Sequence, residues 1–239
     1  MKIALLGYGK MGQAIEEIAL LRRHEVVLKV SIENLEDATI KNIRQADVVI
    51  EFTGPESAFD NIKLCIGAGV PVVSGSTGWL DKYAEIKKYC NSKNGGLLYA
   101  SNFSVGVNIF FALNKKLTEL MKGHGYNVEL KEIHHTQKKD APSGTAITLA
   151  EQVLENNGQK KKWVNEASDN KEDLVIISER TDPAPGTHII KYYSDVDDIC
   201  ISHTAHNRKG FATGAVLAAE FLNDHKNGIY SMKDVLGIN

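Results

Sequence analysis

The sequence has little of what marks proteins that bind nucleic acids or membranes. Its 28 lysines and arginines stand against 30 aspartates and glutamates, which gives a formal net charge of −2. A nucleic-acid-binding protein usually carries a basic surplus instead. The longest apolar runs also fall well short of the ~18 residues that cross a membrane. These deficits predict a protein that binds neither nucleic acid nor a membrane.

Cysteine is scarce as well. Cys65, Cys90 and Cys200 are odd in number and widely spaced, without a CxxC motif. This pattern predicts neither a disulfide framework nor a zinc knuckle. The apolar stretch "IALL" near the start is shorter than the ~7-residue apolar core of a signal peptide. We therefore expect a cytoplasmic protein.

The first hundred residues alternate between two hydrophobic periods. Short apolar runs at 2–9, 25–32, 46–53, 70–78 and 95–103 are rich in valine, isoleucine and leucine, and most of them end in glycine, serine or threonine. Segments with helical spacing separate several of these runs, at 11–23, 57–69 and 80–94. Strands that alternate with helices predict an α/β domain with a parallel sheet.

The pattern changes in the second half of the chain. A long helical pattern at 106–124 leads into an alternating strand at 126–135, and a second helix follows at 143–158. Three further strand patterns, at 173–180, 187–194 and 198–206, lie close enough together to form an antiparallel or mixed sheet. The sequence thus predicts a second domain of α+β type, followed by a helix at 211–225.

The segment "GYGKMG" carries the spacing GxGxxG in Gly7, Gly9 and Gly12. It follows the first predicted strand and opens the first predicted helix, which is the context of a dinucleotide-binding loop. Gly7 would allow the tight turn, Gly9 the approach of a pyrophosphate, and Gly12 close packing of the helix on the sheet. A glycine-rich turn without a ligand is the alternative.

An acidic residue at the end of the second strand should bind the adenosine ribose. Glu33 lies there, 21 residues after Gly12, although it could also be an ordinary surface turn residue. Its carboxylate would repel the 2′-phosphate of NADPH, and Asn34 rather than an arginine follows it. Lys10 in the glycine loop could compensate. The expected cofactor is therefore NAD(P)H, with a preference for NADH or dual use.

The third and fourth predicted strands end in small and hydroxyl-bearing residues. In an open parallel sheet, ligands bind beyond the carboxyl ends of the strands. We therefore expect part of the cofactor site at these strand ends, although each residue alone could be a simple turn residue. The candidates are Thr53, Gly54, Gly75, Ser76, Thr77 and Gly78.

The segment "EIHHTQKKDAPSGTA", residues 132–146, joins a predicted strand to a predicted helix. His134, His135 and Lys138 lie at the strand end and in the loop, and Gly144 and Thr145 lie in the first helical turn. Free backbone N–H groups at such a turn bind anions. A histidine beside them can deliver a proton, because its ordinary pKa of about 6.5 is near neutrality. This combination suits a small dicarboxylate.

Three simpler explanations compete with a catalytic role for this segment. Adjacent histidines can bind a metal, but neighbours on a strand point to opposite faces, so we expect no metal site. The lysines could be ordinary loop charges. The "SGT" sequence could be a helix cap and nothing more.

Taken together, these motifs resemble the dihydrodipicolinate reductase family. The central segment matches the family signature E-x-H-H-x-x-K-x-D-x-P-S-G-T-A, and "GYGKMG", "GSTGW", "ASNFSVGVN" and "HTAHNRKGFATGA" resemble its other conserved blocks in the same order. The resemblance implies an oxidoreductase of the diaminopimelate–lysine pathway. Such an enzyme uses NAD(P)H to reduce dihydrodipicolinate, or its 4-hydroxy-tetrahydro form, to tetrahydrodipicolinate.

The resemblance also implies residue roles. His134 would be the general acid and Lys138 a catalytic and substrate-binding lysine, while His135, Gly144 and Thr145 would contact the carboxylates of the cyclic substrate. Gly7, Lys10, Met11, Gly12 and Glu33 would bind the adenine half of the cofactor. The nicotinamide half would contact Gly75 to Gly78 and the turn made of Ala100, Ser101, Asn102 and Phe103.

In fold, the resemblance implies a Rossmann dinucleotide-binding domain, residues 1–105, which the C-terminal segment 209–239 completes. Residues 106–208 would form a mixed-sheet domain for substrate binding and assembly into a homotetramer. The stretch 180–203, which contributes to that sheet, is shorter here than is usual for the family.

Overall fold

The computed structural model describes residues 1–238. These form two compact units, Met1–Asn108 with the C-terminal segment that begins at Arg208, and Ile109–Asn207. The boundaries expected from the sequence, 105/106 and 208/209, fall close to these. Over the described residues, no helix is both long enough and apolar enough to cross a membrane.

The first unit is built on a six-stranded parallel sheet in the order β11-β5-β4-β3-β1-β2. The strands are β1 (Lys2–Leu6), β2 (Glu25–Val30), β3 (Val48–Glu51), β4 (Val72–Ser74), β5 (Gly96–Tyr99) and β11 (Gly228–Tyr230). The expected α/β fold of Rossmann type is confirmed. Strand β11 was not expected, because polar residues flank its three residues, whereas the equally short β4 lies in the apolar run VPVV.

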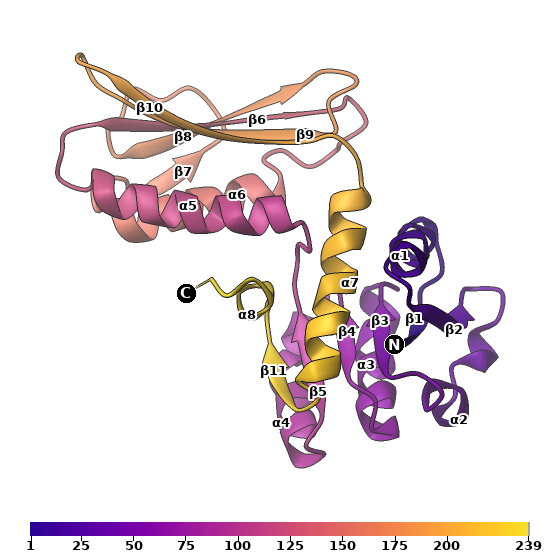
Figure 1. Ribbon diagram of the computed structural model, residues 1–239. Helices are drawn as coiled ribbons and strands as arrows, with labels where there is room; N and C mark the ends of the chain where they lie inside the picture. Colours follow the sequence, from indigo (N-terminus) through magenta and orange to yellow (C-terminus); the bar gives the residue numbers. More distant parts are fainter. Residues whose placement is uncertain (239) are drawn as a thin grey trace. The chain divides into compact units, whose positions relative to one another are not determined.

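Helices cover both faces of this sheet, as Figure 1 shows. Ile3 and Leu5 of β1 pack with α1 (Lys10–Leu21), α7 (Lys209–Asp224) and α8 (Met232–Leu236). Ala4 and Leu6 point the other way, toward α2 (Ile40–Ile43), α3 (Pro55–Ala68) and α4 (Tyr83–Ser92). Since both faces are buried, the strands are apolar throughout rather than alternating. Two short 3₁₀ turns, Leu35–Asp37 and Leu80–Lys82, complete the loops.

The second unit contains a five-stranded mixed sheet in the order β10-β9-β6-β8-β7. Its strands are β6 (Asn127–His134), β7 (Lys162–Val164), β8 (Asp173–Arg180), β9 (Gly186–Tyr193) and β10 (Asp198–Ala205). Strand β6 runs parallel to β8 and antiparallel to β9. Despite the shortened stretch 180–203, β9 and β10 are both eight residues long.

Both helices of the second unit pack on one face of its sheet (Figure 1). Phe110 and Met121 of α5 (Val105–Met121) and Leu149 of α6 (Gly144–Asn157) join Leu130 and Ile190 of the sheet in one apolar cluster. Among the described residues of this unit, no helix covers the opposite face. That face carries the alternate residues of each strand, such as Lys131, Ile177 and Ile189.

Two glycines of α7 differ in how much space a side chain would have at their positions. A Cβ atom on Gly214 would lie 1.6 Å from the backbone oxygen of Phe103, whereas a Cβ on Gly210 would meet nothing nearer than Ser104 Oγ at 3.7 Å. Helix α7 therefore contacts the chain after β5 through a bare backbone at Gly214.

We predict that Gly214→Ala destabilises the first unit, because the clash involves backbone that cannot rotate away. Overpacking of this kind costs about 1–3 kcal/mol or more. Gly210→Ala in the same helix is the matched control. It should leave the melting temperature unchanged or raise it slightly, since alanine favours helix by up to ~1 kcal/mol. Thermal unfolding followed by circular dichroism measures both, and equal melting temperatures would contradict the packing argument.

Candidate active site

Strand β6 changes character along its buried face. Val128 and Leu130 belong to the apolar core, and the next two residues on the same face are Glu132 and His134. Both polar side chains are buried. Because side chains alternate between the two faces of a strand, Glu132 and His134 both lie on the face that the helices cover, at the carboxyl end of β6.

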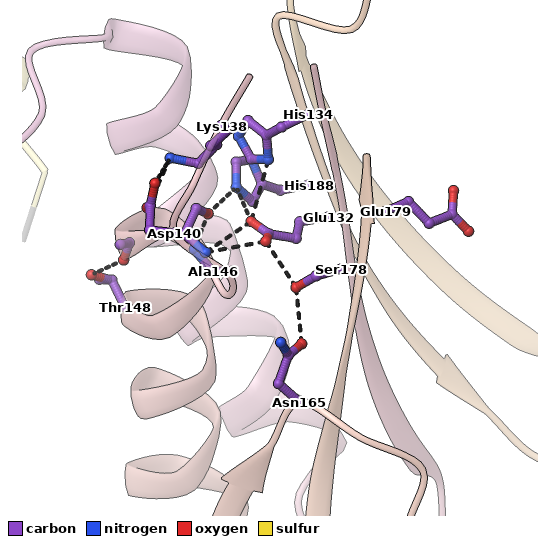
Figure 2. A network of polar contacts seen from close by, with 12 residues as sticks. Glu132, His134, Lys138, Asp140, Ala146, Thr148, Asn165, Ser178, Glu179 and His188 are labelled. Atoms are coloured by element: carbon purple, nitrogen blue, oxygen red, sulfur yellow. Dashed lines mark hydrogen bonds and ion pairs between the residues drawn. The ribbon is translucent and has the colours of Figure 1, made fainter. Parts of the chain in front are cut away.

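The sheet register brings further polar side chains to this pair. Glu132 lies opposite Ser178 of β8 on one side and His188 of β9 on the other. His134 lies opposite Arg180 of β8. Figure 2 shows the resulting network, in which Glu132 occupies the centre.

Glu132 has no solvent-exposed surface, yet its carboxylate is fully hydrogen-bonded. The backbone N–H of Ser143 donates to both oxygens at 3.1 Å, Ser178 Oγ donates at 2.9 Å and Arg180 Nη2 at 3.2 Å. Burial acts to raise the pKa of Glu132, but these hydrogen bonds outweigh it and lower the pKa below its ordinary value. The carboxylate is therefore a buried anion that its donors stabilise.

His134 lies next to this anion. Its Nδ1 is 3.4 Å from Glu132 Oε2, which is longer than a formed charge-assisted hydrogen bond. The ring packs on Gly186, where a Cβ atom would come within 3.1 Å of Nε2. Burial lowers the pKa of His134, the negative charge of Glu132 opposes that change, and the positive charges of Lys138 and Arg180 add to it.

His188 forms the third side of the cluster. Its Nε2 is 3.1 Å from Ser143 Oγ and 3.7 Å from Glu132 Oε2. Its ring meets that of His134 edge-on, with centroids 5.1 Å apart. Burial lowers the pKa of His188 to about 4. His188 is thus uncharged near neutral pH.

The first turn of α6 lies directly beside the cluster. Ser143 caps the helix by accepting the N–H of Ala146. The N–H groups of Gly144 and Thr145 have no acceptor within a helix, as is general for a first turn. Gly144 is exposed, and the space that a Cβ atom would occupy there is open to at least 4 Å. An anion can therefore approach this backbone closely.

Lys138 and Asp140 occupy the loop between β6 and α6. The ammonium of Lys138 lies 2.8 Å from both oxygens of Asp140. Arg180 also donates to the backbone oxygens of Lys138 and Asp140 and so fixes this loop. In Figure 2, Lys138 and His134 lie on the same side of the network. His135, the next residue after β6, is half-buried and takes no part in it.

In the first unit, the three glycines of the GxGxxG motif occupy different environments. Gly7 has a positive φ of 95°, and a Cβ there would clash with the backbone oxygen of Phe52 at 2.0 Å. A Cβ on Gly12 would lie 2.6 Å from the backbone oxygen of Gly7. Gly9, the N-cap of α1, has nothing within 4 Å. The turn and the packing thus require Gly7 and Gly12, while Gly9 leaves the helix start open.

The other cofactor candidates lie together at the carboxyl end of the parallel sheet. Thr53 follows β3, Gly75 to Gly78 follow β4, and Ala100 to Phe103 follow β5, so all lie beyond the carboxyl ends of neighbouring strands. Glu33, in the turn after β2, and Lys10 are exposed, and Met11 is half-buried. Phe103 is buried in the core and offers a ligand its backbone alone.

A buried carboxylate also binds several residues at this end of the sheet through hydrogen bonds. Glu51, the last residue of β3, has no exposed surface and accepts hydrogen bonds from the Ser74 and Ser76 hydroxyls, at 2.6 and 2.7 Å, and from Thr53 N–H at 2.9 Å. The Thr53 hydroxyl donates to it as well. The Ser76 side chain therefore points into the protein, which leaves its backbone to face a ligand.

The cluster in the second unit also has the composition of a metal site. Glu132, His134 and His188 each offer a ligand atom, all within 4.8 Å of one another. The pair considered from the sequence, His134 with His135, is not the pair brought together. Glu132 already accepts four hydrogen bonds, one of them from the guanidinium of Arg180. A divalent cation would have to share the carboxylate with that positive charge.

Sequence reasoning missed most of this network. Glu132 stood within the central motif without a role, and Arg180 and His188 come from strands far along the chain. One signal was available: in β6, Glu132 and His134 continue the buried face begun by Val128 and Leu130. A polar pair on an apolar face indicates buried partners, although it does not identify them.

Family models match nearly all of the chain. The model for the N-terminus of dihydrodipicolinate reductase matches residues 1–103, and that for its C-terminus matches residues 106–236. Among curated relatives, the 4-hydroxy-tetrahydrodipicolinate reductase of Christiangramia forsetii is 50% identical over 237 residues, which cover 99% of this chain and 98% of the relative. That of Methanocaldococcus jannaschii is 35% identical, with 96% and 84% covered.

Solved structures share the fold. A dipicolinate-bound dihydrodipicolinate reductase from Paenisporosarcina sp. TG-14 superposes with a TM-score of 0.77 at 24% identity, covering 97% of each chain. An aspartate semialdehyde dehydrogenase II from Vibrio cholerae has a TM-score of 0.54 at 12% identity, covering 92% of this chain and 97% of its own. The two family models and the 50% identity over almost the full length establish that this chain belongs to the dihydrodipicolinate reductase family.

Proposed function

We propose that this chain catalyses the NAD(P)H-dependent reduction of dihydrodipicolinate, or of 4-hydroxy-tetrahydrodipicolinate, to tetrahydrodipicolinate in diaminopimelate and lysine biosynthesis. One observation carries the proposal: a buried histidine, a lysine and the open first turn of α6 lie together. Membership of the family supports the same reaction.

The two units have different binding functions in this proposal. We assign dinucleotide binding to the unit that contains the GxGxxG loop and the strand ends carrying Thr53, Gly75 to Gly78 and Ala100 to Phe103. Substrate binding belongs to the unit of Ile109–Asn207, where one carboxylate of the substrate accepts the N–H groups of Gly144 and Thr145. Lys138 and His135 supply positive charge or hydrogen bonds to the dicarboxylate. Lys138 must exchange its ion pair with Asp140 for this contact.

NAD(P)H, when bound, supplies a hydride to one carbon of the substrate ring. The reduction is completed when His134, as the imidazolium, gives a proton to the neighbouring carbon. Since Nδ1 of His134 faces Glu132, Nε2 is the nitrogen that delivers the proton. A substrate with two negative charges favours the protonated ring, because it offsets the positive charges of Lys138 and Arg180 that oppose protonation.

The cofactor preference rests on Glu33. Its exposed carboxylate follows β2, where it suits the two hydroxyls of an NADH ribose and repels a 2′-phosphate. Lys10, exposed at the start of α1, offsets part of that repulsion. We therefore propose a preference for NADH or use of both cofactors.

A homotetramer is the proposed assembly. The face of the second unit's sheet opposite α5 and α6 mixes aliphatic side chains with charged ones, as an interface between copies would. Exposed Ile177 lies on this face, near the ion pair of Lys131 with Glu179 at 2.7 Å. Sedimentation velocity gives the mass directly, and a monomer at micromolar concentration would contradict the proposal. A cytoplasmic location stays a prediction.

A semialdehyde dehydrogenase shares the fold but needs a different chemistry. Such an enzyme uses an activated thiolate as nucleophile. Cys65 and Cys90 are buried, and burial raises the pKa of both thiols, so neither is activated. The exposed Cys200 lies on β10, and its backbone pairs with Lys191 of β9. Turnover that survives alkylation of thiols separates the two functions.

The first prediction concerns the reaction itself. The protein should oxidise NADH when it is given the condensation product of pyruvate and aspartate semialdehyde, and not without it. The KM for NADH should be equal to or lower than that for NADPH, because Glu33 disfavours the 2′-phosphate. Absorbance at the nicotinamide band measures both constants. A lack of turnover with either cofactor would overturn the proposed function.

The second prediction concerns the acid. His134→Gln should lower kcat by about 10²–10⁴-fold, the usual contribution of a general acid, and change KM far less. Glutamine retains a polar side chain of similar size, so the fold should persist, and circular dichroism checks this. Full turnover in the variant would show that another group delivers the proton.

The third prediction concerns the carboxylate site. Gly144→Ala places a methyl group in the open space over the first turn of α6, where the substrate carboxylate is expected. KM should rise by about tenfold to a hundredfold, the cost of a lost charge-assisted hydrogen bond. The melting temperature should not fall, because the methyl group meets no protein atom within 4 Å. An unchanged KM would place the substrate elsewhere.

A further inference from the structure

We propose that Glu132 is a positioning residue for His134. Its buried carboxylate holds the imidazole ring by Nδ1 and keeps enough of it protonated for Nε2 to act as the acid. This inference rests on the proposed function, since it assumes that His134 is the proton donor. It adds a role to a residue that contacts neither substrate nor cofactor.

Hydrogen bonds hold the Glu132 side chain in place. Three residues from two different elements donate to its carboxylate: Ser143 at the start of α6, and Ser178 and Arg180 on β8. The side chain is completely buried, and its own strand is paired on both sides. A carboxylate held in this way is a fixed reference for the ring beside it.

The contacts of the His134 ring also favour a pairing with Glu132. Nδ1 is buried and lacks a hydrogen bond among the described residues, with Glu132 Oε2 the nearby acceptor at 3.4 Å. Gly186 leaves room for the opposite side of the ring, and His188 meets it edge-on. A buried N–H without a partner is costly. Protonation at Nδ1 therefore draws the ring toward Glu132, and catalytic hydrogen bonds often tighten in this way when the substrate binds.

The charges around His134 make Glu132 its main source of negative potential. The charged and titratable groups around His134 are Glu132 on its own strand, Lys138 and Asp140 in the following loop, Arg180 on β8 and His188 on β9, with His203 of β10 beyond His188. Lys138 and Asp140 form an ion pair, and His188 is uncharged near neutral pH. The charge balance at His134 thus rests on Glu132 against Arg180. Removal of the carboxylate charge would leave the ring beside an unopposed guanidinium.

A purely structural role for Glu132 makes a different prediction. In that case loss of the carboxylate would lower stability and reduce activity equally at every pH. A positioning role adds a change in the pH dependence, because the protonated fraction of His134 changes. Turnover of a general acid falls as the pH rises through the pKa of that acid, so the alkaline limb of the profile reports on His134.

The main experiment compares pH profiles of kcat/KM and kcat for the wild type and Glu132→Gln. The neutral amide withdraws the charge that favours the imidazolium, so the alkaline limb should move to lower pH. Above neutral pH, kcat should fall by about tenfold or more, short of the full ~10²–10⁴-fold contribution of the acid. Glu132→Asp keeps the charge at a greater distance, so it should return the limb toward its wild-type position.

Two control variants isolate the charge. Ser178→Ala removes one hydrogen bond to Glu132 but leaves its charge, so it should lower the melting temperature without moving the limb. Glu151→Gln makes the same carboxylate-to-amide change at an exposed position of α6 and should alter neither. An alkaline limb that stays in place in Glu132→Gln, with a uniform loss of activity, would overturn the inference and leave Glu132 a structural residue.

An NMR titration tests the inference without turnover, in case the activity of Glu132→Gln is too low for a pH profile. Titration of ¹⁵N-labelled histidine by NMR, in the presence of dipicolinate as a stable planar dicarboxylate, follows His134 directly once His134→Gln has assigned its signals. Its midpoint should move to lower pH in Glu132→Gln, and an unmoved midpoint would contradict the inference. If the wild type fails to turn over at all, the proposed function fails. If the wild type is active and His134→Gln is not, an alkaline limb that stays in place in Glu132→Gln contradicts only the role of Glu132.

Discussion

The second unit depends on one buried anion, Glu132. A carboxylate without exposed surface is tolerable because four hydrogen bonds from β8 and the start of α6 compensate for lost hydration. Those same bonds hold the cap of the helix whose first turn is open, and Arg180 also donates to the backbone of the loop that carries Lys138. A single electrostatic requirement thus determines where each proposed catalytic group lies.

The first unit also has a buried, hydrogen-bonded carboxylate at the carboxyl end of its sheet. Glu51 ends β3 as Glu132 nearly ends β6, and each accepts hydrogen bonds from a backbone N–H that follows its own strand and from hydroxyls on or just after a neighbouring strand. In both units, ligand groups are expected on loops, which are inherently mobile. A buried carboxylate beneath the loops gives them a fixed geometry without occupying the surface that a ligand needs. Rigid support of this kind is what precise binding requires.

Much of the fold could be predicted from the sequence, because apolar periods report directly on strands and helices. The alternation in the first hundred residues and the GxGxxG loop gave the parallel sheet, and the central motif gave the family. The three-residue strands β7 and β11 were not predicted, because polar residues flank both and neither lies in an apolar run. The partners of Glu132 escaped for another reason. Register between β6, β8 and β9 decides which residues face it. The alternating pattern of a strand shows which of its side chains point inward, but not which residue of a distant strand lies opposite each one.

The return of α7 to the first unit has a consequence for the order of events during synthesis. Residues 1–108 form most of the parallel sheet, but one face of it is covered by α7, whose small side chains Ala212, Ala215 and Ala219 pack in that core. The ribosome releases α7 only after all of the segment 109–207 has been made. The second unit can therefore complete its core first, although it is encoded later. The dinucleotide-binding sheet must wait with one apolar face covered only by α1, and a nascent chain with exposed apolar surface is open to chaperones and to aggregation.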